Sequence, residues 1–191
     1  MSEQSLLPGL DEPAKPKHLI FLAAVPDVDA IPQIRNVTQQ LVAQHGLTGK
    51  PIAEGRMHIT LLELSEYVDL PDSLLDAISR AAATVSQPAF DVVFDQTERY
   101  AYSSACVLTV SAPSDGFSAL KHSLFVALKA EGVMRKKASV PHITLLYDRK
   151  PVPRQSVEPV TWKVREFVLL HRRLDQKGGA YDVLARWALQ D

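Results

Sequence analysis

The tripeptide His-Ile-Thr occurs twice in the sequence, at His58 to Thr60 and at His142 to Thr144. Each copy opens an apolar run that predicts a β-strand, MHITLLEL in the first case and PHITLLYD in the second. Side chains alternate between the two faces of a strand, so each copy places one imidazole and one hydroxyl on a single face. If the two strands lie side by side, two imidazoles and two hydroxyls line one groove. Such a groove suits a reaction that needs a proton removed at one end of the substrate and supplied at the other.

The two copies stand in the same sequence context. A predicted strand (residues 18–25 and 105–112) is followed by a Pro turn, a helical pattern and a glycine, and the His-Ile-Thr strand comes next. Asp27 and Ser114 can cap the exposed amides of the two helices, and Gly46 and Gly132 can take the left-handed conformation that ends them. Both helices have an apolar stripe that predicts a core face: Val28, Ile31, Ile34, Val37, Leu41 and Val42 in the first, and Phe117, Leu120, Leu124, Phe125 and Leu128 in the second.

The rest of the chain predicts one more helix and several strands. The helix is expected over residues 71–86, and strands over 90–95, around 99–102, over 162–170 and over 181–189, with Gln96 and Thr97 as a turn. The paired glycines of the segment 175–179 suit a hairpin turn between the last two strands. Strands that are close enough to pair antiparallel, with helices on the outer faces, predict the α+β class.

Length and composition limit the alternatives. The chain has 191 residues, of which 46% are apolar, and a net charge of -1. This length is enough for one compact unit. The net charge does not indicate nucleic-acid binding, so any site for a polyanion must be a local cluster of positive charge. Cys106 is the single cysteine, which excludes a disulfide framework and a cysteine-based zinc site. We expect residues 1–16 to form a flexible tail, residues 17–191 to form one domain, and the protein to be cytoplasmic, with no membrane contact and no obligate protein partner.

Two His-x-Thr strands 84 residues apart (142 minus 58), each preceded by a strand and a helix, resemble the 2H phosphoesterase superfamily. Within it, the chain is most similar to the RNA 2',3'-cyclic phosphodiesterases, also called 2'-5' RNA ligases. The resemblance runs from about His18 to Leu189. It includes the PHITLL block, the Arg56-Met57-His58 approach to the first motif, and the closing segment FVLLHRRLDQKGGAYDVLARWAL.

The resemblance implies a bilobal α+β fold, in which each lobe is a small antiparallel sheet with outer helices and the motifs face each other across a central cleft. It implies hydrolysis of RNA 2',3'-cyclic phosphate ends to 2'-phosphates, without metal or cofactor, and a reverse reaction that forms a 2'-5' bond. By resemblance, His142 is the base that activates water and His58 the acid that protonates the 3' oxygen. Thr60 and Thr144 then donate hydrogen bonds to the phosphate oxygens. The sequence alone leaves the assignment of acid and base open.

The second motif departs from the family pattern at Tyr147, where the RNA phosphodiesterases often have an arginine. A guanidinium for the phosphate could come instead from Arg149, from Arg56 or from the basic cluster 135–137. The first motif also departs, because it continues Leu62-Glu63-Leu64 where the group commonly ends Phe-Leu-Gly. The substrate alternatives are therefore RNA ends, a small cyclic nucleotide and an ADP-ribose cyclic phosphate. A third alternative is a non-catalytic module that binds RNA ends.

Five further side chains are candidates for the site. His171 could rim the cleft, and four aromatic residues could stack on a base, with Tyr181 the first to test: Phe21, Trp162, Phe167 and Tyr181. Zinc at His58 and His142 is unattractive, because no third histidine or carboxylate stands at ligand spacing.

Overall fold

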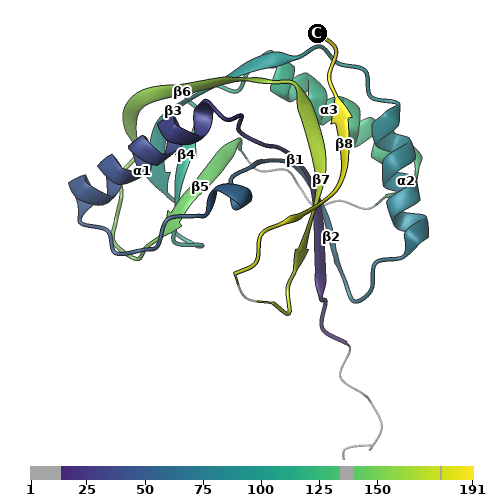
Figure 1. Cartoon of the computed structure of the whole chain (residues 1–191), viewed down its shortest axis with the longest axis horizontal. Helices are drawn as coiled ribbons and strands as arrows, with labels where there is room; N and C mark the ends of the chain where they lie inside the picture. The colour runs from purple at the N-terminus through teal and green to yellow at the C-terminus, as the bar shows by residue number, and fades with distance from the viewer. Residues whose placement is uncertain (1–13, 134–139, 177) are drawn as a thin grey trace, which may run out of the picture.

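The computed structural model describes residues 14–133, 140–176 and 178–191, which form two four-stranded antiparallel sheets and three α-helices (Figure 1). The first sheet has the order β2-β1-β7-β8, with β1 at His18–Ala24, β2 at Ile59–Tyr67, β7 at Glu166–Arg173 and β8 at Asp182–Ala188. The second has the order β5-β4-β3-β6, with β3 at Phe90–Arg99, β4 at Ala105–Thr109, β5 at His142–Tyr147 and β6 at Gln155–Val164. The helices are α1 at Ala30–His45, α2 at Asp72–Ala83 and α3 at Asp115–Ala130. The predicted α+β class and the two antiparallel sheets are confirmed.

The predicted repeat is also confirmed, as β1-α1-β2 and β4-α3-β5, and each motif strand is the edge strand of its sheet. The Asp27 carboxylate accepts the amide N–H of Ala30 at 2.8 Å, and the Ser114 hydroxyl accepts an amide N–H in the first turn of α3. Gly46 and Gly132 both have positive φ, 58° and 69°.

Three members of the predicted core stripes are not in the core, and one of them, Ile31, is half-buried on α1. Val28 is 78% exposed because α1 begins only at Ala30, so Val28 precedes the helix and does not share its apolar face. Phe125 is 41% exposed on α3.

The helices do not simply cover the sheets from which they come. α1 follows β1 of the first sheet but packs on β5 and β6 of the second, and in Figure 1 it lies on the side of the second sheet. α3 follows β4 of the second sheet but contacts β2 of the first as well as β3, and packs on α2. The segment after α1 also crosses over, because Ile52 donates its N–H to the carbonyl oxygen of Leu145 in β5 at 2.7 Å. The two sheets therefore share one hydrophobic core.

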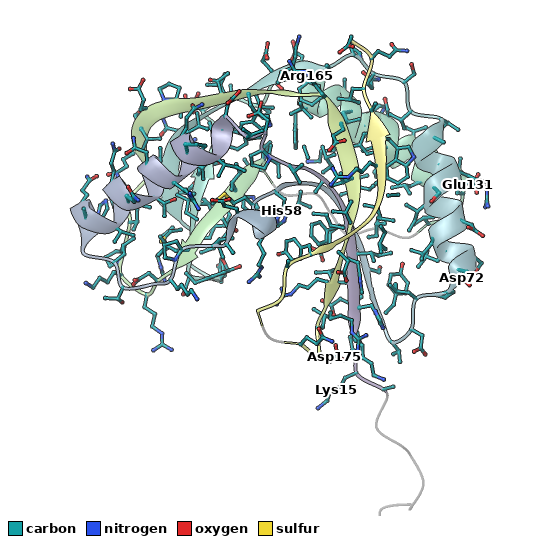
Figure 2. All side chains as sticks on the ribbon, viewed as in Figure 1. Lys15, His58, Asp72, Glu131, Arg165 and Asp175 are labelled. Carbon is teal, nitrogen blue, oxygen red and sulfur yellow. The ribbon has the colours of Figure 1, made fainter. Side chains whose placement is uncertain are left out.

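Two of the strand predictions were wrong. The run 162–170 is not one strand: β6 ends at Val164, the chain bends at Arg165, and β7 begins in the other sheet (Figure 2 labels Arg165). Gln96 and Thr97 do not form a turn, and no separate strand lies around residues 99–102: β3 runs through to Arg99, and residues 101–103 form the turn. β3 lies between β4 and β6, and Thr97 is fully buried there, so tertiary packing overrides the polar character of the pair.

A second, smaller apolar cluster lies on the other face of the first sheet. It consists of Phe21, Ala23, Val168 and Leu170, with Tyr181 packed against it. In the described part of the chain no helix is both long and apolar enough to cross a membrane.

Candidate active site

Both motif strands contain a β-bulge at the same place, directly after the threonine. In each strand one leucine is skipped in the pairing with the neighbouring strand, Leu61 in β2 and Leu145 in β5. The pairs on either side are Ala23 with Thr60 and Leu22 with Leu62 in the first sheet, and Val107 with Thr144 and Cys106 with Leu146 in the second. Bulges are common beside active sites, where they redirect side chains.

The bulges determine which residues lie on the same face of each sheet as the threonines. Without them, the third residue after each threonine would point to the opposite face, because side chains alternate along a strand. With them, Tyr147 pairs with Ala105 and Glu63 pairs with Phe21, so both lie on the threonine face of their sheets. The skipped leucines and the leucines that follow them all remain in the shared core. The bulge at Leu145 therefore puts Tyr147, three residues after Thr144, on the same face of the sheet as Thr144.

The two imidazoles are oriented by the same kind of hydrogen bond. Nδ1 of His58 lies 2.8 Å from the carbonyl oxygen of Arg56, and Nδ1 of His142 lies 2.8 Å from that of Val140. A carbonyl oxygen can only accept, so Nδ1 carries the hydrogen in both rings. Nε2 of each ring is then the atom left to exchange a proton, as acceptor in the neutral form and donor in the charged form.

His58 is packed between two aromatic rings. Its ring centroid lies 4.9 Å from that of Phe21 and 5.2 Å, edge to face, from that of Tyr181. The Arg56 guanidinium lies over the Tyr181 ring, 5.4 Å from the centroid. The pKa of His58 is lowered to about 4, chiefly by burial and also by the charges of His142 and Arg56, while the hydrogen bond to the Arg56 carbonyl opposes the shift.

His142 belongs to the other sheet, where the Tyr100 ring meets it edge to face at 5.2 Å. Burial raises the pKa of the Tyr100 hydroxyl. The two motif strands are thus edge strands of two different sheets, and they contact each other between the sheets. The histidines still act on one another, because the charge of His142 depresses the pKa of His58.

The other predicted site residues lie in two different places. Arg56 and Tyr181 lie beside His58, whereas Tyr147 is 52% exposed at the end of β5. Arg149 lines a separate pocket with Thr48, Gly49, Ser104, Tyr147 and Asp148. The basic cluster 135–137 lies outside the described residues.

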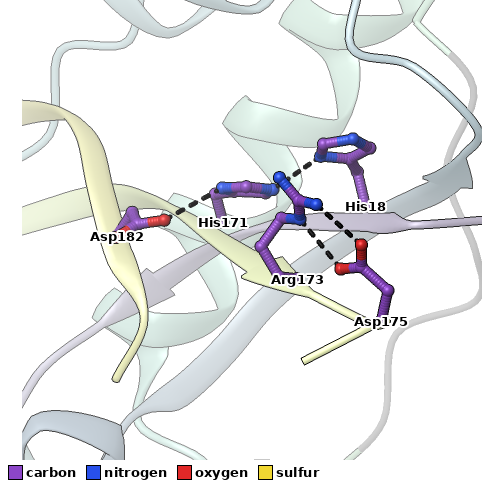
Figure 3. Close-up of polar contacts among 5 residues, drawn as sticks. All are labelled: His18, His171, Arg173, Asp175 and Asp182. Carbon is purple, nitrogen blue, oxygen red and sulfur yellow. Dashed lines mark hydrogen bonds and ion pairs between the residues drawn. The ribbon is translucent and has the colours of Figure 1, made fainter. Parts of the chain in front are cut away.

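Three of the four aromatic candidates for base stacking are buried, so only Tyr181 is partly exposed. Trp162 stacks on Phe94, and Phe167 stacks on Trp187. His171 is buried too, and it is hydrogen-bonded to His18 and Asp182 (Figure 3).

Asp148 is a site-supporting residue that the sequence reasoning missed. Its carboxylate accepts amide N–H bonds from Thr48 at 2.6 Å and from Gly49 and Lys150 at 2.9 Å each. These bonds, that of Lys150 first, hold the pKa of the buried Asp148 well below its usual range. A Cβ at Gly49 would lie 2.0 Å from the carbonyl oxygen of Tyr147, so the close approach needs glycine. Asp148 thereby ties the chain that leads to His58 to the end of the strand that carries His142.

The described residues contain no group of three or more His, Cys, Asp or Glu side chains that could hold a metal ion. The groups that the site offers are two imidazole Nε2 atoms and two half-buried threonine hydroxyls on the threonine faces. Paired imidazoles can remove one proton and supply another, and hydroxyl donors can stabilise negative charge on oxygen.

Comparison with known proteins identifies the family of the chain. The family model described as "2'-5' RNA ligase superfamily" matches residues 26–176. The RNA 2',3'-cyclic phosphodiesterase of Thermus thermophilus is 31% identical over 155 residues, covering 74% of this chain and 76% of that protein. The Escherichia coli protein of the same name is 28% identical over 144 residues, covering 74% and 80%. The crystal structure of E. coli LigT complexed with 3'-AMP superposes with a TM-score of 0.72 at 26% identity, covering 93% of this chain and 100% of that one. The chain therefore belongs to the 2'-5' RNA ligase superfamily of 2H phosphoesterases.

Proposed function

We propose that this protein hydrolyses RNA 2',3'-cyclic phosphate ends to 2'-phosphates by acid and base catalysis at His58 and His142. The observation that carries the proposal is the matched orientation of the two imidazoles. Each has Nδ1 bound to a carbonyl oxygen at 2.8 Å, which leaves Nε2 for proton transfer. The names of the two curated relatives support the substrate class, since both are RNA 2',3'-cyclic phosphodiesterases.

In the proposed reaction, Nε2 of His142 accepts a proton from water as the water oxygen bonds to phosphorus. The bond from phosphorus to the 3' oxygen breaks, and Nε2 of His58 gives its proton to that oxygen. The products are a 3'-hydroxyl and a 2'-phosphate. Run backward with a 5'-hydroxyl in place of water, the same steps form a 2'-5' phosphodiester, so ligation is a side capacity of the site.

The acid role of His58 depends on the substrate. With a pKa of about 4, its ring is neutral near pH 7 in the free protein. The cyclic phosphate is an anion, and a unit charge about 4 Å away is worth about 4 kcal/mol at an effective dielectric of about 20. Since a tenfold change in protonation corresponds to about 1.4 kcal/mol, one bound phosphate offsets the depression caused by burial. His58 would therefore gain its proton as the substrate binds.

Thr60 and Thr144 are proposed to donate their hydroxyl hydrogens to the two non-bridging oxygens, where negative charge develops in the transition state. Both threonines are half-buried next to a β-bulge, so their positions are fixed by the sheet. We propose no metal and no cofactor in this scheme, because imidazolium and hydroxyl donors supply the charge stabilisation.

The partners proposed are RNA ends and small cyclic-phosphate nucleotides. E. coli LigT has been crystallised with 3'-AMP and with NADP+, which supports nucleotides as the ligand class. Because Tyr147 stands in place of the family arginine, a small cyclic nucleotide or an ADP-ribose cyclic phosphate is the alternative substrate.

The test is a product assay on a 2',3'-cyclic-phosphate oligonucleotide, in the presence and absence of EDTA. We expect a 2'-phosphate product, no effect of EDTA, and a loss of activity of about 10²- to 10⁴-fold in His58→Ala and in His142→Ala. His122→Ala is the matched control, because His122 is exposed on α3. A 3'-phosphate product would mean that the 2' oxygen is the leaving group, which would exchange the roles of the acid and the base. Full activity in both variants would refute the mechanism, and tight binding of the oligonucleotide without product would favour the binding module instead.

A further inference from the structure

A small basic pocket of about 70 Å³ lies at the hairpin between β7 and β8, next to the residues around His58. Its walls are three arginines and the hairpin segment, namely Arg56, Arg172, Arg173, Gln176, Gly178, Gly179, Ala180 and Asp182. One water needs about 10–15 Å³ of such space, so the pocket has room for several waters, or for the oxygens of one phosphate.

The pocket adjoins the proposed catalytic site through Tyr181 and Arg56. Arg56 lies over the Tyr181 ring, and that ring meets the ring of His58 at 5.2 Å. In β7, Val168 and Leu170 belong to the small apolar cluster beside His58, and by alternation Arg172 lies on the same face of the sheet. Its partner in β1 is Leu19, which also packs against that cluster. Arg172, which is one wall of the pocket, therefore lies on the same face of the first sheet as the proposed catalytic imidazole.

Two of the charges around the pocket are already paired. Figure 3 shows Arg173 bound to Asp175, with N–O distances of 2.9 and 2.6 Å, and His171 bound to Asp182 at 3.2 Å. The bond from Arg173 lowers the pKa of Asp175 to about 2. The His171–Asp182 pair joins β7 to β8, whereas the Arg173–Asp175 pair lies within the β7 side of the hairpin.

The other two guanidinium groups of the pocket have no anionic partner in the part of the chain that the structure describes. Neither Arg56 nor Arg172 forms an ion pair within residues 14–133, 140–176 and 178–191. Nε of Arg56 is buried without a hydrogen-bond acceptor in that part of the chain. Buried donors in folded proteins nearly always have a partner, so this atom points to an acceptor that a ligand supplies.

We propose that Arg56 and Arg172 bind the phosphodiester that precedes the terminal nucleoside of the substrate, while Tyr181 packs against that nucleoside. Guanidinium groups bind phosphate oxygens in pairs, and an aromatic ring accepts any base by stacking. The inference rests on the proposed function and names its substrate class: cyclic-phosphate-ended oligonucleotides rather than cyclic mononucleotides, which lack this phosphate.

The experiment compares kcat/KM for a dinucleotide that ends in a 2',3'-cyclic phosphate with kcat/KM for the corresponding cyclic mononucleotide. The enzymes are the wild type, Arg172→Gln, and Arg165→Gln, which removes the same charge from the exposed bend far from His58 in Figure 2. We expect the wild type to prefer the dinucleotide by about 10- to 100-fold, the range of one charge-assisted hydrogen bond. Arg172→Gln should lose most of that preference and Arg165→Gln should keep it. Equal losses on both substrates, or no loss, would overturn the proposal.

A dinucleotide with an uncharged methylphosphonate linkage separates the phosphate from the second nucleoside. It should react with the wild type like the mononucleotide, and a rate equal to that of the natural dinucleotide would mean that base contacts give the preference. If the wild type turned over none of the substrates, the proposed function would fail. The pocket would still be tested by calorimetric binding of a 2'-phosphate-ended dinucleotide to the wild type and Arg172→Gln, where equal affinities would refute it.

Discussion

The backbone oxygen of Arg56 accepts the Nδ1 hydrogen of His58 at 2.8 Å, so the residue that ends the short 3-10 helix Glu54–Arg56 sets the direction of the His58 ring. The side chain of the same arginine lies over the ring of Tyr181. One residue thus fixes the imidazole through its main chain and faces the basic pocket through its side chain.

The pKa of His58 should respond to phosphate. NMR titration of the imidazole should give a value near 4 in the free protein and a higher one with inorganic phosphate or a 2'-phosphate product bound. The alkaline limb of the kcat profile, which reports the complex, should then lie at higher pH than that of kcat/KM. A free-protein pKa near the ordinary 6.5 would contradict the burial argument.

The same burial makes folding stability depend on pH. The folded-state pKa of His58 lies below the unfolded value of 6.5, so the unfolded chain binds more protons between pH 6.5 and 4. This group's contribution is complete above pH 6.5 and is lost as the pH falls toward 4, by about 3 kcal/mol in all. Urea unfolding of the wild type and His58→Gln at pH 7 and pH 5 should show a smaller acid loss in the variant. Equal losses would refute this.

The threonine hydroxyls can be removed without changing side-chain shape. Thr60→Val and Thr144→Val should each lower kcat by about 10²- to 10³-fold, as removal of an oxyanion donor does, with little change in thermal stability. Thr→Ser at either position keeps the donor and should recover most of the rate. Thr161→Val on the exposed face of β6 is the control. If valine and serine variants were equally active, the hydroxyls would have no catalytic role.

Tyr147 can be tested by restoring the family arginine. The bulge at Leu145 places position 147 on the face of Thr144, so Tyr147→Arg should lower KM for a cyclic-phosphate substrate severalfold and make it more sensitive to salt. Tyr147→Phe should leave both nearly unchanged, because Tyr147 is 52% exposed and only the hydroxyl is lost. An arginine variant with unchanged KM would place the substrate phosphate away from this strand end.

Asp148 should matter for stability rather than chemistry. Asp148→Ala leaves the amides of Thr48, Gly49 and Lys150 without their acceptor and should lower the melting temperature clearly, whereas Asp91→Ala at an exposed position should not. The folded-state pKa of Asp148 is depressed, so its contribution is complete above about pH 4 and is lost as the pH falls further. Equal melting temperatures for both variants across that range would refute this role.

Much of the fold followed from local patterns. Apolar stripes, the caps at Asp27 and Ser114, and the glycines at positive φ fixed the repeated strand-helix-strand unit, and the duplicated tripeptide fixed the candidate histidines. The break between β6 and β7 at Arg165 was missed. The buried residues stand at even-numbered positions before it, Trp162 and Val164, and the next one stands at an odd-numbered position, Phe167. That change of parity is the signal that could have found it.

Other features had no local signal. The bulges after Thr60 and Thr144 arise in the pairing with β1 and β4, and no periodicity within one strand reports them. Arg172 reads as one of two adjacent exposed arginines. It is distinguished from Arg173 only because Asp175 pairs with Arg173, which becomes visible once the hairpin is folded.

The crossing of α1 onto β5 and β6 makes the two halves of the chain depend on one another. A half-length chain with one strand-helix-strand unit would hold its helix away from its own two strands and leave their core face exposed to water. The first His-x-Thr strand therefore needs the second half of the chain for its core as well as for its partner histidine.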